Sequence, residues 1–167
     1  MSTAISEQQR NQIKLQGFLE DKLKWHDYTH IAVDDEDLPL AERFVHTVGR
    51  ARAGKPELIL TGCADLQRAM DLIADVVAHE DRVGLLSDGL MLSASEARSP
   101  LLIKDVSTSF VREKRVAQAS SRFGSAIRVF QVAWPDAQGR FPHEADYDAD
   151  GHPQQALWEE TDLPSPG

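Results

Sequence analysis

A basic loop in the first third of the chain holds the side chains best suited to chemistry. Residues 49–55, GRARAGK, have the G-x-x-x-x-G-K spacing of a phosphate-binding loop. The next residue is Pro56, which lacks the hydroxyl that would bind magnesium and also lacks a backbone donor. The strand-like segment ELIL follows, whereas a phosphate-binding loop leads into a helix N-terminus. The sequence therefore predicts no nucleotide hydrolysis at this loop.

The cations of the loop leave two interpretations open. Arg50, Arg52 and Lys55 lie on a glycine-containing turn and could hold a carboxylate or a phosphate. The alternative is a solvated hairpin tip, which is the usual state of charged loop residues and is favoured here. Glu57 follows the loop and is expected to form a salt bridge with Arg50 or Arg52.

An acid–base pair is the second candidate chemistry of this region. His46 could act as a general base, with Glu57 to orient it or with Arg50 and Arg52 to hold an acidic substrate. Cys63 lies between a predicted strand and a helix start, where backbone amides can lower the pKa of a thiol. A small buried hydrophobe is the favoured interpretation of that cysteine.

Two patterns suggest metal ligands but are incomplete. The run from Asp146 to Asp150 reproduces the first half of a calcium loop, yet Leu157 stands where a bidentate Glu is required. His26, His30 and His46 could supply three nitrogen ligands if their strands pair, although hydrogen-bonded histidines are more common on such faces. We therefore expect no metal and no cofactor.

Composition and charge limit the function classes. The formal net charge is −9, and no Lys or Arg follows Arg140. A near-neutral body with an acidic tail argues against nucleic-acid binding, which needs a basic face. No apolar run is long enough to span a membrane, and the first residues do not have the pattern of a secretory signal. With Cys63 as the single cysteine, a cytoplasmic location is expected.

Apolar spacing and helix-end signals predict the elements that position these residues. Ser6 and Gln9 have the pattern of a capping box, so a helix is predicted from there to about Lys24. A second helix is predicted over residues 65–79, where apolar residues recur at helical spacing. Strands are predicted at 25–33, 44–49, 56–61 and 126–134, two or three more strands within 82–106, and a third helix at about 109–123.

This order of elements indicates an α+β fold. Strands joined by hairpin-length links predict a mainly antiparallel sheet, with two packed helices and an additional N-terminal helix. We divide the chain into an N-terminal helix at 1–24, a single α+β domain at 25–143 and an acidic, partly ordered tail at 144–167.

Several short motifs follow one another in an order that resembles a known family. They are Trp25, His46-Thr47-Val48-Gly49-Arg50, Lys55-Pro56-Glu57-Leu58-Ile59, Gly62, Trp134-Pro135-Asp136, Gly139 and Phe141-Pro142. Over roughly residues 17–157 the chain resembles the bacterial domain-of-unknown-function family 4262. His46, Arg50, Lys55 and His143 stand where that family has Tyr, Leu, His and Trp, so the resemblance implies a divergent member. It implies a domain and a site region but no reaction.

We expect a small cytoplasmic binding or accessory module whose pocket lies between the hairpin at 47–57 and the corner at Trp134. Its guest would be a small anionic ligand or a partner peptide. The predicted ligand-binding residues are Thr47, Gly49, Arg50, Arg52, Lys55, Trp134 and Asp136. The alternative is a small enzyme that uses His46 as general base. A third hypothesis is an interaction protein that contacts a partner through its N-terminal helix and acidic tail. A homo-oligomer is left open as a further alternative.

Overall fold

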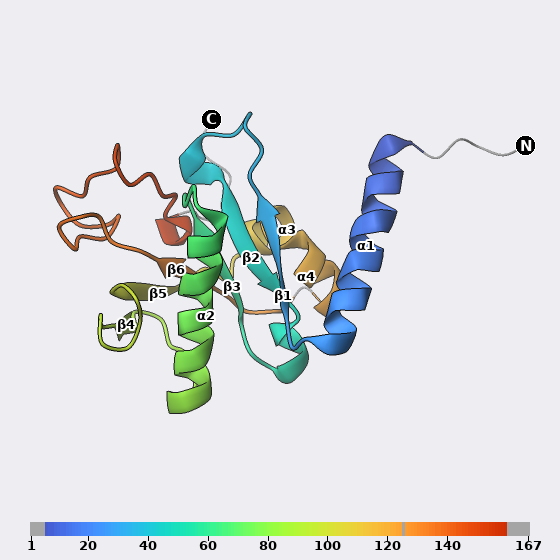
Figure 1. The fold of residues 1–167 in the computed structure, drawn as a ribbon, viewed down its shortest axis with the longest axis horizontal. Helices are drawn as coiled ribbons and strands as arrows, with labels where there is room; N and C mark the ends of the chain where they lie inside the picture. The colour runs from blue at the N-terminus through green and yellow to red at the C-terminus, as the bar shows by residue number, and fades with distance from the viewer. Residues whose placement is uncertain (1–5, 125, 160–167) are drawn as a thin grey trace, which may run out of the picture.

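A six-stranded sheet organises the computed structural model, which describes residues 6–124 and 126–159 (Figure 1). The strand order is β1-β2-β3-β6-β5-β4. Only β3 and β6 pair in parallel among these neighbours, and the other pairs are antiparallel. The predicted α+β fold with a mainly antiparallel sheet is confirmed. The strands are β1 (Thr29–Val33), β2 (Phe44–Val48), β3 (Glu57–Thr61), β4 (Met91–Leu92), β5 (Leu101–Asp105) and β6 (Val129–Ala133).

Four α-helices and three short 3₁₀ turns complete the described chain. The predicted capping box is present, because the side chain and backbone of Ser6 exchange hydrogen bonds with Gln9. Asp65 caps the second helix by accepting a hydrogen bond from the Arg68 amide. The helices are α1 (Glu7–Trp25), α2 (Leu66–Val83), α3 (Ser109–Lys114) and α4 (Ala117–Phe123), and the turns are η1 (Leu40–Glu42), η2 (Arg50–Ala53) and η3 (Leu157–Glu159).

Several predicted boundaries are wrong. The strand predicted at 25–33 begins only at Thr29, and Trp25 is the last residue of α1. The helix predicted over 65–79 continues to Val83 and ends at Gly84, whose φ of 120° suits glycine, so residues 82–83 are helical rather than part of a strand. The helix predicted over 109–123 is two helices, because Val116, with φ of −112° and ψ of 40°, leaves the helical conformation between α3 and α4. Val116 is buried at this break, so tertiary packing overrides a sequence that contains no Pro or Gly there.

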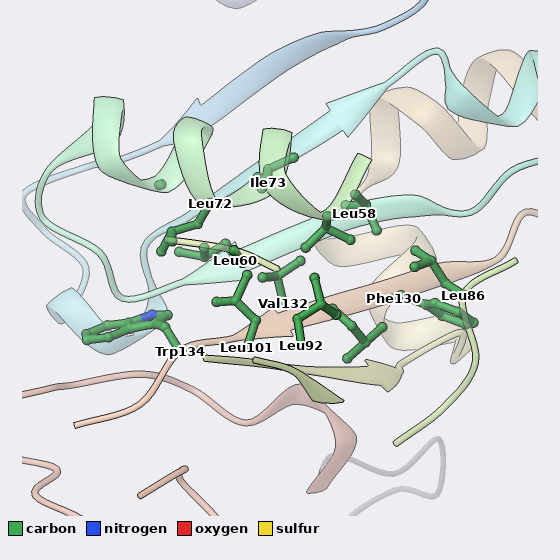
Figure 2. Packing of buried hydrophobic residues seen from close by; sticks show 14 of the residues in the cluster. Leu58, Leu60, Leu72, Ile73, Leu86, Leu92, Leu101, Phe130, Val132 and Trp134 are labelled. Atoms are coloured by element: carbon green, nitrogen blue, oxygen red, sulfur yellow. The ribbon is translucent and has the colours of Figure 1, made fainter. Parts of the chain in front are cut away.

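The sheet separates two apolar layers. On one face, α2 packs through Leu72, Ile73 and Val76 against strand residues that include Leu58 and Leu60 (Figure 2). On the other face, Leu19 of α1, Val111 of α3 and Ala119 of α4 pack around Val48 and Ile59. Each face of β3 is therefore covered, as expected for a central strand with a near-continuous apolar run.

The segment after β6 returns to the sheet and packs against it. Thr61 Oγ1 and Gln131 Nε2 both donate hydrogen bonds to the Gln155 carbonyl, each at 2.8 Å. The Leu157 amide donates to Gln131 Oε1 at 2.8 Å, and the Leu157 side chain is buried. Gly62 lies so close to this segment that a Cβ there would stand 1.9 Å from the Pro153 carbonyl oxygen. The three-part division of the chain stays a prediction, and its residues 1–5 and 160–167 lie outside the described part.

Within the residues that the structure describes, no helix has both the length and the hydrophobicity of a membrane span.

Candidate functional site

A buried glutamate shapes the loop between β2 and β3. Glu57 Oε1 accepts hydrogen bonds from the Gly49 and Ala51 amides at 3.1 and 2.9 Å, and its Oε2 accepts one from Thr47 Oγ1 at 3.2 Å. Thr47 Oγ1 in turn accepts a hydrogen bond from the Leu58 amide at 2.9 Å. Burial raises the pKa of Glu57 to about 7, although the hydrogen bonds to its carboxylate act in the opposite direction. Glu57 and Thr47 thus hold the turn in place from beneath.

Arg50 lies inside the protein, where it pairs with a different acid from the one predicted. Its Nη2 donates to the carboxylate of Glu80 on α2, and its Nε donates to the Pro56 carbonyl at 2.9 Å. The guanidinium also stands over the Tyr28 ring, 5.9 Å from its centroid. The expected salt bridge with Glu57 is therefore wrong, and so is the solvated state of the loop at Arg50. Tertiary contact with α2, 30 residues away in the chain, supplies the partner.

Arg52 fixes the end of α1 to the loop. Its guanidinium donates to the carbonyls of Leu23, His26 and Asp27 at 2.8–2.9 Å. The last carbonyls of a helix have no partner within the helix, so a cation with several donors caps them well. The backbones also approach closely here, because a Cβ at Gly49 would stand 2.8 Å from the Asp27 carbonyl oxygen. The φ of Gly49 is 124°, a value that other residues rarely adopt.

These contacts enclose a cavity of about 520 Å³ between the end of α1, the loop with η2, and the last turns of α2. Lys55 lies on its wall and forms an ion pair with Asp81 at 3.0 Å. Trp25 and Tyr28 add two aromatic rings. The lining residues are Leu23, Lys24, Trp25, His26, Asp27, Tyr28, Gly49, Arg50, Arg52, Ala53, Lys55, Val77 and Asp81. Four of the predicted ligand-binding residues, Gly49, Arg50, Arg52 and Lys55, thus meet at one cavity.

Of the other three predicted ligand-binding residues, Thr47 is buried beneath the loop and is not part of the cavity lining. Trp134 and Asp136 lie at the opposite end of the sheet. Glu57 pairs with Val129 in the parallel register of β3 and β6. Trp134 directly follows β6, five residues after Val129, which is roughly 16 Å away at the rise of a strand. Trp134 Nε1 donates at 3.0 Å to the carbonyl of Thr61, the last residue of β3. The prediction of one pocket between the loop and the Trp134 corner is therefore wrong.

Asp136 organises the turn after β6. Its carboxylate accepts hydrogen bonds from the amides of Gln138, Arg140 and Asp148 at 2.9–3.0 Å. A separate hollow of about 320 Å³ lies beside Trp134 and Asp136 and includes Arg68 and His152 in its lining. These bonds give Asp136 a structural role in closing the corner.

His46 belongs to the apolar interior. Its side chain is stacked on Phe44 with ring centroids 6.0 Å apart, its Nδ1 is 3.0 Å from the Thr47 carbonyl oxygen, and the residue is only 2% exposed. Burial lowers the pKa of His46 to about 4. Glu57 turns toward the loop amides instead of orienting this ring. A general base must reach its substrate, so the geometry favours a packing role for His46.

The remaining candidates are dispersed. No group of three or more His, Cys, Asp or Glu side chains in the described ranges is arranged to hold a metal ion. His26 lines the cavity, whereas His30 makes an edge contact with Tyr28. Cys63 donates to the Asp65 carbonyl, and burial raises the pKa of its thiol, the opposite of activation.

Sequence reasoning missed several residues of the cavity region, namely Lys24, Trp25 and Tyr28 as lining residues and Glu80 and Asp81 as ion-pair partners. Glu80 did leave a signal, because it follows Ile73 and Val76 at helical spacing and so shares their inward face. A buried position in that pattern requires a charged partner for a glutamate. Trp25 left no comparable signal, since its exposure depends on how the linker at 26–28 leaves α1.

Comparison with known proteins gives one finding. A family model described as a domain of unknown function, DUF4262, matches residues 22–148. Neither the curated proteins nor the solved structures compared with the chain contain a match.

Proposed function

Because the chain belongs to the DUF4262 family, and the family match contains every residue that lines the cavity, we propose that this cavity is the ligand site of a small-anion-binding module. The observation that carries the proposal is the charge of the lining. Four cationic residues, Lys24, Arg50, Arg52 and Lys55, line the cavity together with two carboxylates, in a chain whose formal net charge is −9. A cleft with an excess of one sign of charge attracts ligands of the opposite sign.

The four cations have different tasks in this proposal. Arg52 is held by the carbonyls of Leu23, His26 and Asp27 and contributes a fixed positive charge. The charge of Arg50 is balanced by Glu80, so Arg50 mainly positions the loop. Lys24 and Lys55 lie toward solvent and can contact a guest directly. Lys55 pairs at 3.0 Å with the exposed carboxylate of Asp81 and lies 3.9 Å from the buried carboxylate of Glu80. The exposed pair with Asp81 contributes only about 0–1 kcal/mol. A ligand carboxylate or phosphate can therefore replace Asp81 at Lys55 with little loss.

The cavity has a size suited to a small molecule. A volume of about 520 Å³ lies within the range of roughly 300–1,000 Å³ that ligand pockets occupy. An acidic side chain of a partner peptide would offer the same carboxylate to Lys55, so the peptide is a second source of the same chemistry. The enzyme hypothesis is less well supported, because it requires substrate contact at His46, which is buried and is not part of the cavity lining.

The test is a titration of the full chain with pyrophosphate and with citrate, followed by calorimetry. Lys55→Met removes a charge-assisted contact, and we expect affinity to fall about tenfold or more. Lys104→Met is the matched control, because Lys104 pairs with the exposed Asp88 at 3.4 Å, away from the cavity, much as Lys55 pairs with Asp81. The Lys104→Met variant should bind each anion with the same affinity as the unchanged protein.

Two results would contradict the proposal. One is the absence of binding of either anion to the unchanged protein at low salt, where electrostatic attraction is strongest. The other is equal weakening by Lys55→Met and Lys104→Met, which would indicate a general charge effect rather than a site.

A further inference from the structure

The exposure of Trp25 is not explained by the packing of the fold. Its side chain is 80% exposed, whereas Trp134 is buried against the sheet. Trp25 is the last residue of α1 and directly follows Lys24. Both residues line the cavity. A tryptophan left in water at the edge of a cavity exposes a large apolar face that a ligand can cover. This face is therefore available for stacking.

Tyr28 supplies a second ring, and this ring is held in place. His30 makes an edge contact with it at 5.4 Å between ring centroids, and the Arg50 guanidinium stands 5.9 Å from its centroid. Burial raises the pKa of Tyr28, so its hydroxyl remains a hydrogen-bond donor. The cavity thus joins one fixed ring and one free ring to the cations described above.

From this combination we infer that the guest is a planar aromatic ring joined to a phosphate or carboxylate, with the ring on Trp25 and the anion at Lys55 and Lys24. The inference rests on the proposed anion site and adds the ring. Nucleotides and aromatic acids share this chemistry, and the experiment below separates them.

A cationic guest is the competing interpretation of the same rings. Aromatic side chains with Asp27 and Asp81 nearby could form a cage for an ammonium group. However, Arg50 already occupies the cation position over the Tyr28 ring. Four cationic residues in the lining also outnumber the two carboxylates. Both observations favour a guest whose charged end is negative.

The experiment compares three compounds that differ by one part each. Adenosine monophosphate has the ring and the anion, ribose 5-phosphate has the anion without the ring, and adenosine has the ring without the anion. Calorimetry on the full chain should give adenosine monophosphate an affinity about tenfold or more above that of ribose 5-phosphate. Comparing benzoate with acetate gives the same test for a carboxylate. The pair in which the ring raises the affinity more identifies the class of ligand.

Variants of one helix locate the ring contact. In the pair of compounds that shows the ring-dependent gain in affinity, Trp25→Ala should lower the affinity of the ring-bearing anion to that of the ring-free anion. The ring-bearing anion is adenosine monophosphate in one pair and benzoate in the other. Trp25→Phe should restore part of the gain in affinity. Phe18→Ala is the matched control, because Phe18 is an exposed aromatic residue of α1 that is not part of the cavity lining, and its affinities should not change.

The outcomes separate this inference from the anion site itself. Equal binding of ring-bearing and ring-free anions would overturn the aromatic guest but leave the anion site standing. A ring-dependent gain that survives Trp25→Ala would also overturn the inference. Preferential binding of phenyltrimethylammonium would support the cage for a cation and reject both proposals, as would failure of all the anions to bind.

Discussion

Arg50 and Glu80 form an ion pair whose two side chains are only 3% and 2% exposed. It joins the loop after β2 to the last turn of α2, and both elements form walls of the cavity. Taking both charges out of water is costly, so the pair contributes more to the position of the loop than to net stability. The relative placement of the loop and α2 therefore depends on this contact.

Removing either partner of the pair should destabilise the protein strongly. Arg50→Met or Glu80→Met leaves one buried charge without its partner, so we expect each change to lower the free energy of unfolding by about 3–5 kcal/mol. The double variant should lose clearly less than the sum, because neither charge is then left unpaired. Urea denaturation of the four proteins measures this coupling. Strict additivity would contradict the pairing of Arg50 with Glu80.

The elements of the fold were predictable where local signals are strong. The capping box at Ser6, the cap at Asp65 and the apolar spacing of α2 are all encoded within a few residues. The basic loop does place Arg50 and Lys55 beside a cavity, but this cavity lies against α1 and α2 rather than toward Trp134 as predicted. The cations, turn glycines and flanking strands that indicate such a place all lie within 20 residues of sequence.

The shape of the site was not predictable, because it depends on pairings between distant segments. The parallel register of Glu57 with Val129 is what separates Trp134 from the loop, and no local pattern specifies it. The sequence likewise favours a solvent-exposed Arg50, because its partner Glu80 is distant in the chain. The packing of α2 places Glu80 next to Arg50. Tyr28 reaches the cavity wall where the α1–β1 linker approaches Gly49 so closely that a Cβ at Gly49 would stand 3.0 Å from the Tyr28 Cα.

Arg52 should be needed for the attachment of α1. Arg52→Lys keeps the charge but loses the fork that reaches three carbonyls, so we expect a loss of about 1–2 kcal/mol in the free energy of unfolding. Hydrogen exchange should rise most in the last turn of α1. Arg128→Lys is the control, since exposed Arg128 reaches only the Gly54 carbonyl among the contacts of its guanidinium that the described residues provide. An equal effect of both changes would contradict the capping role of Arg52.

Leu157 should anchor the returning C-terminal segment. Its side chain is fully buried in the layer that also contains Val48 and Ile59, so Leu157→Ala should lower the free energy of unfolding by about 2–5 kcal/mol. Leu85→Ala is the matched control, because Leu85 is 81% exposed and should change stability by no more than about 0.5 kcal/mol. Thermal or urea denaturation measures both. A negligible effect at Leu157 would show that the segment does not pack on the sheet as described.

His46 and Glu57 should give stability two opposing dependences on pH. The pKa of Glu57 is raised from 4.5 to about 7, so its stabilising contribution is complete below pH 4.5 and is lost as the pH rises through 7. The pKa of His46 is lowered from 6.5 to about 4, so its contribution is complete above pH 6.5 and is lost as the pH falls through 4. Between pH 6.5 and pH 4.5 each amounts to about 2 kcal/mol with opposite sign, so the two nearly cancel.

Neutral replacements should uncover each contribution. Glu57→Gln keeps an acceptor for the Gly49 and Ala51 amides, and we expect it to lose about 2 kcal/mol relative to the unchanged protein between pH 6.5 and pH 4.5, because the contribution of His46 remains alone. His46→Phe should gain about the same amount over that interval, because the contribution of Glu57 remains. Urea denaturation at both pH values measures the differences, in which the titration of all other groups cancels. If both variants follow the pH profile of the unchanged protein, then neither side chain has the pKa that its burial implies.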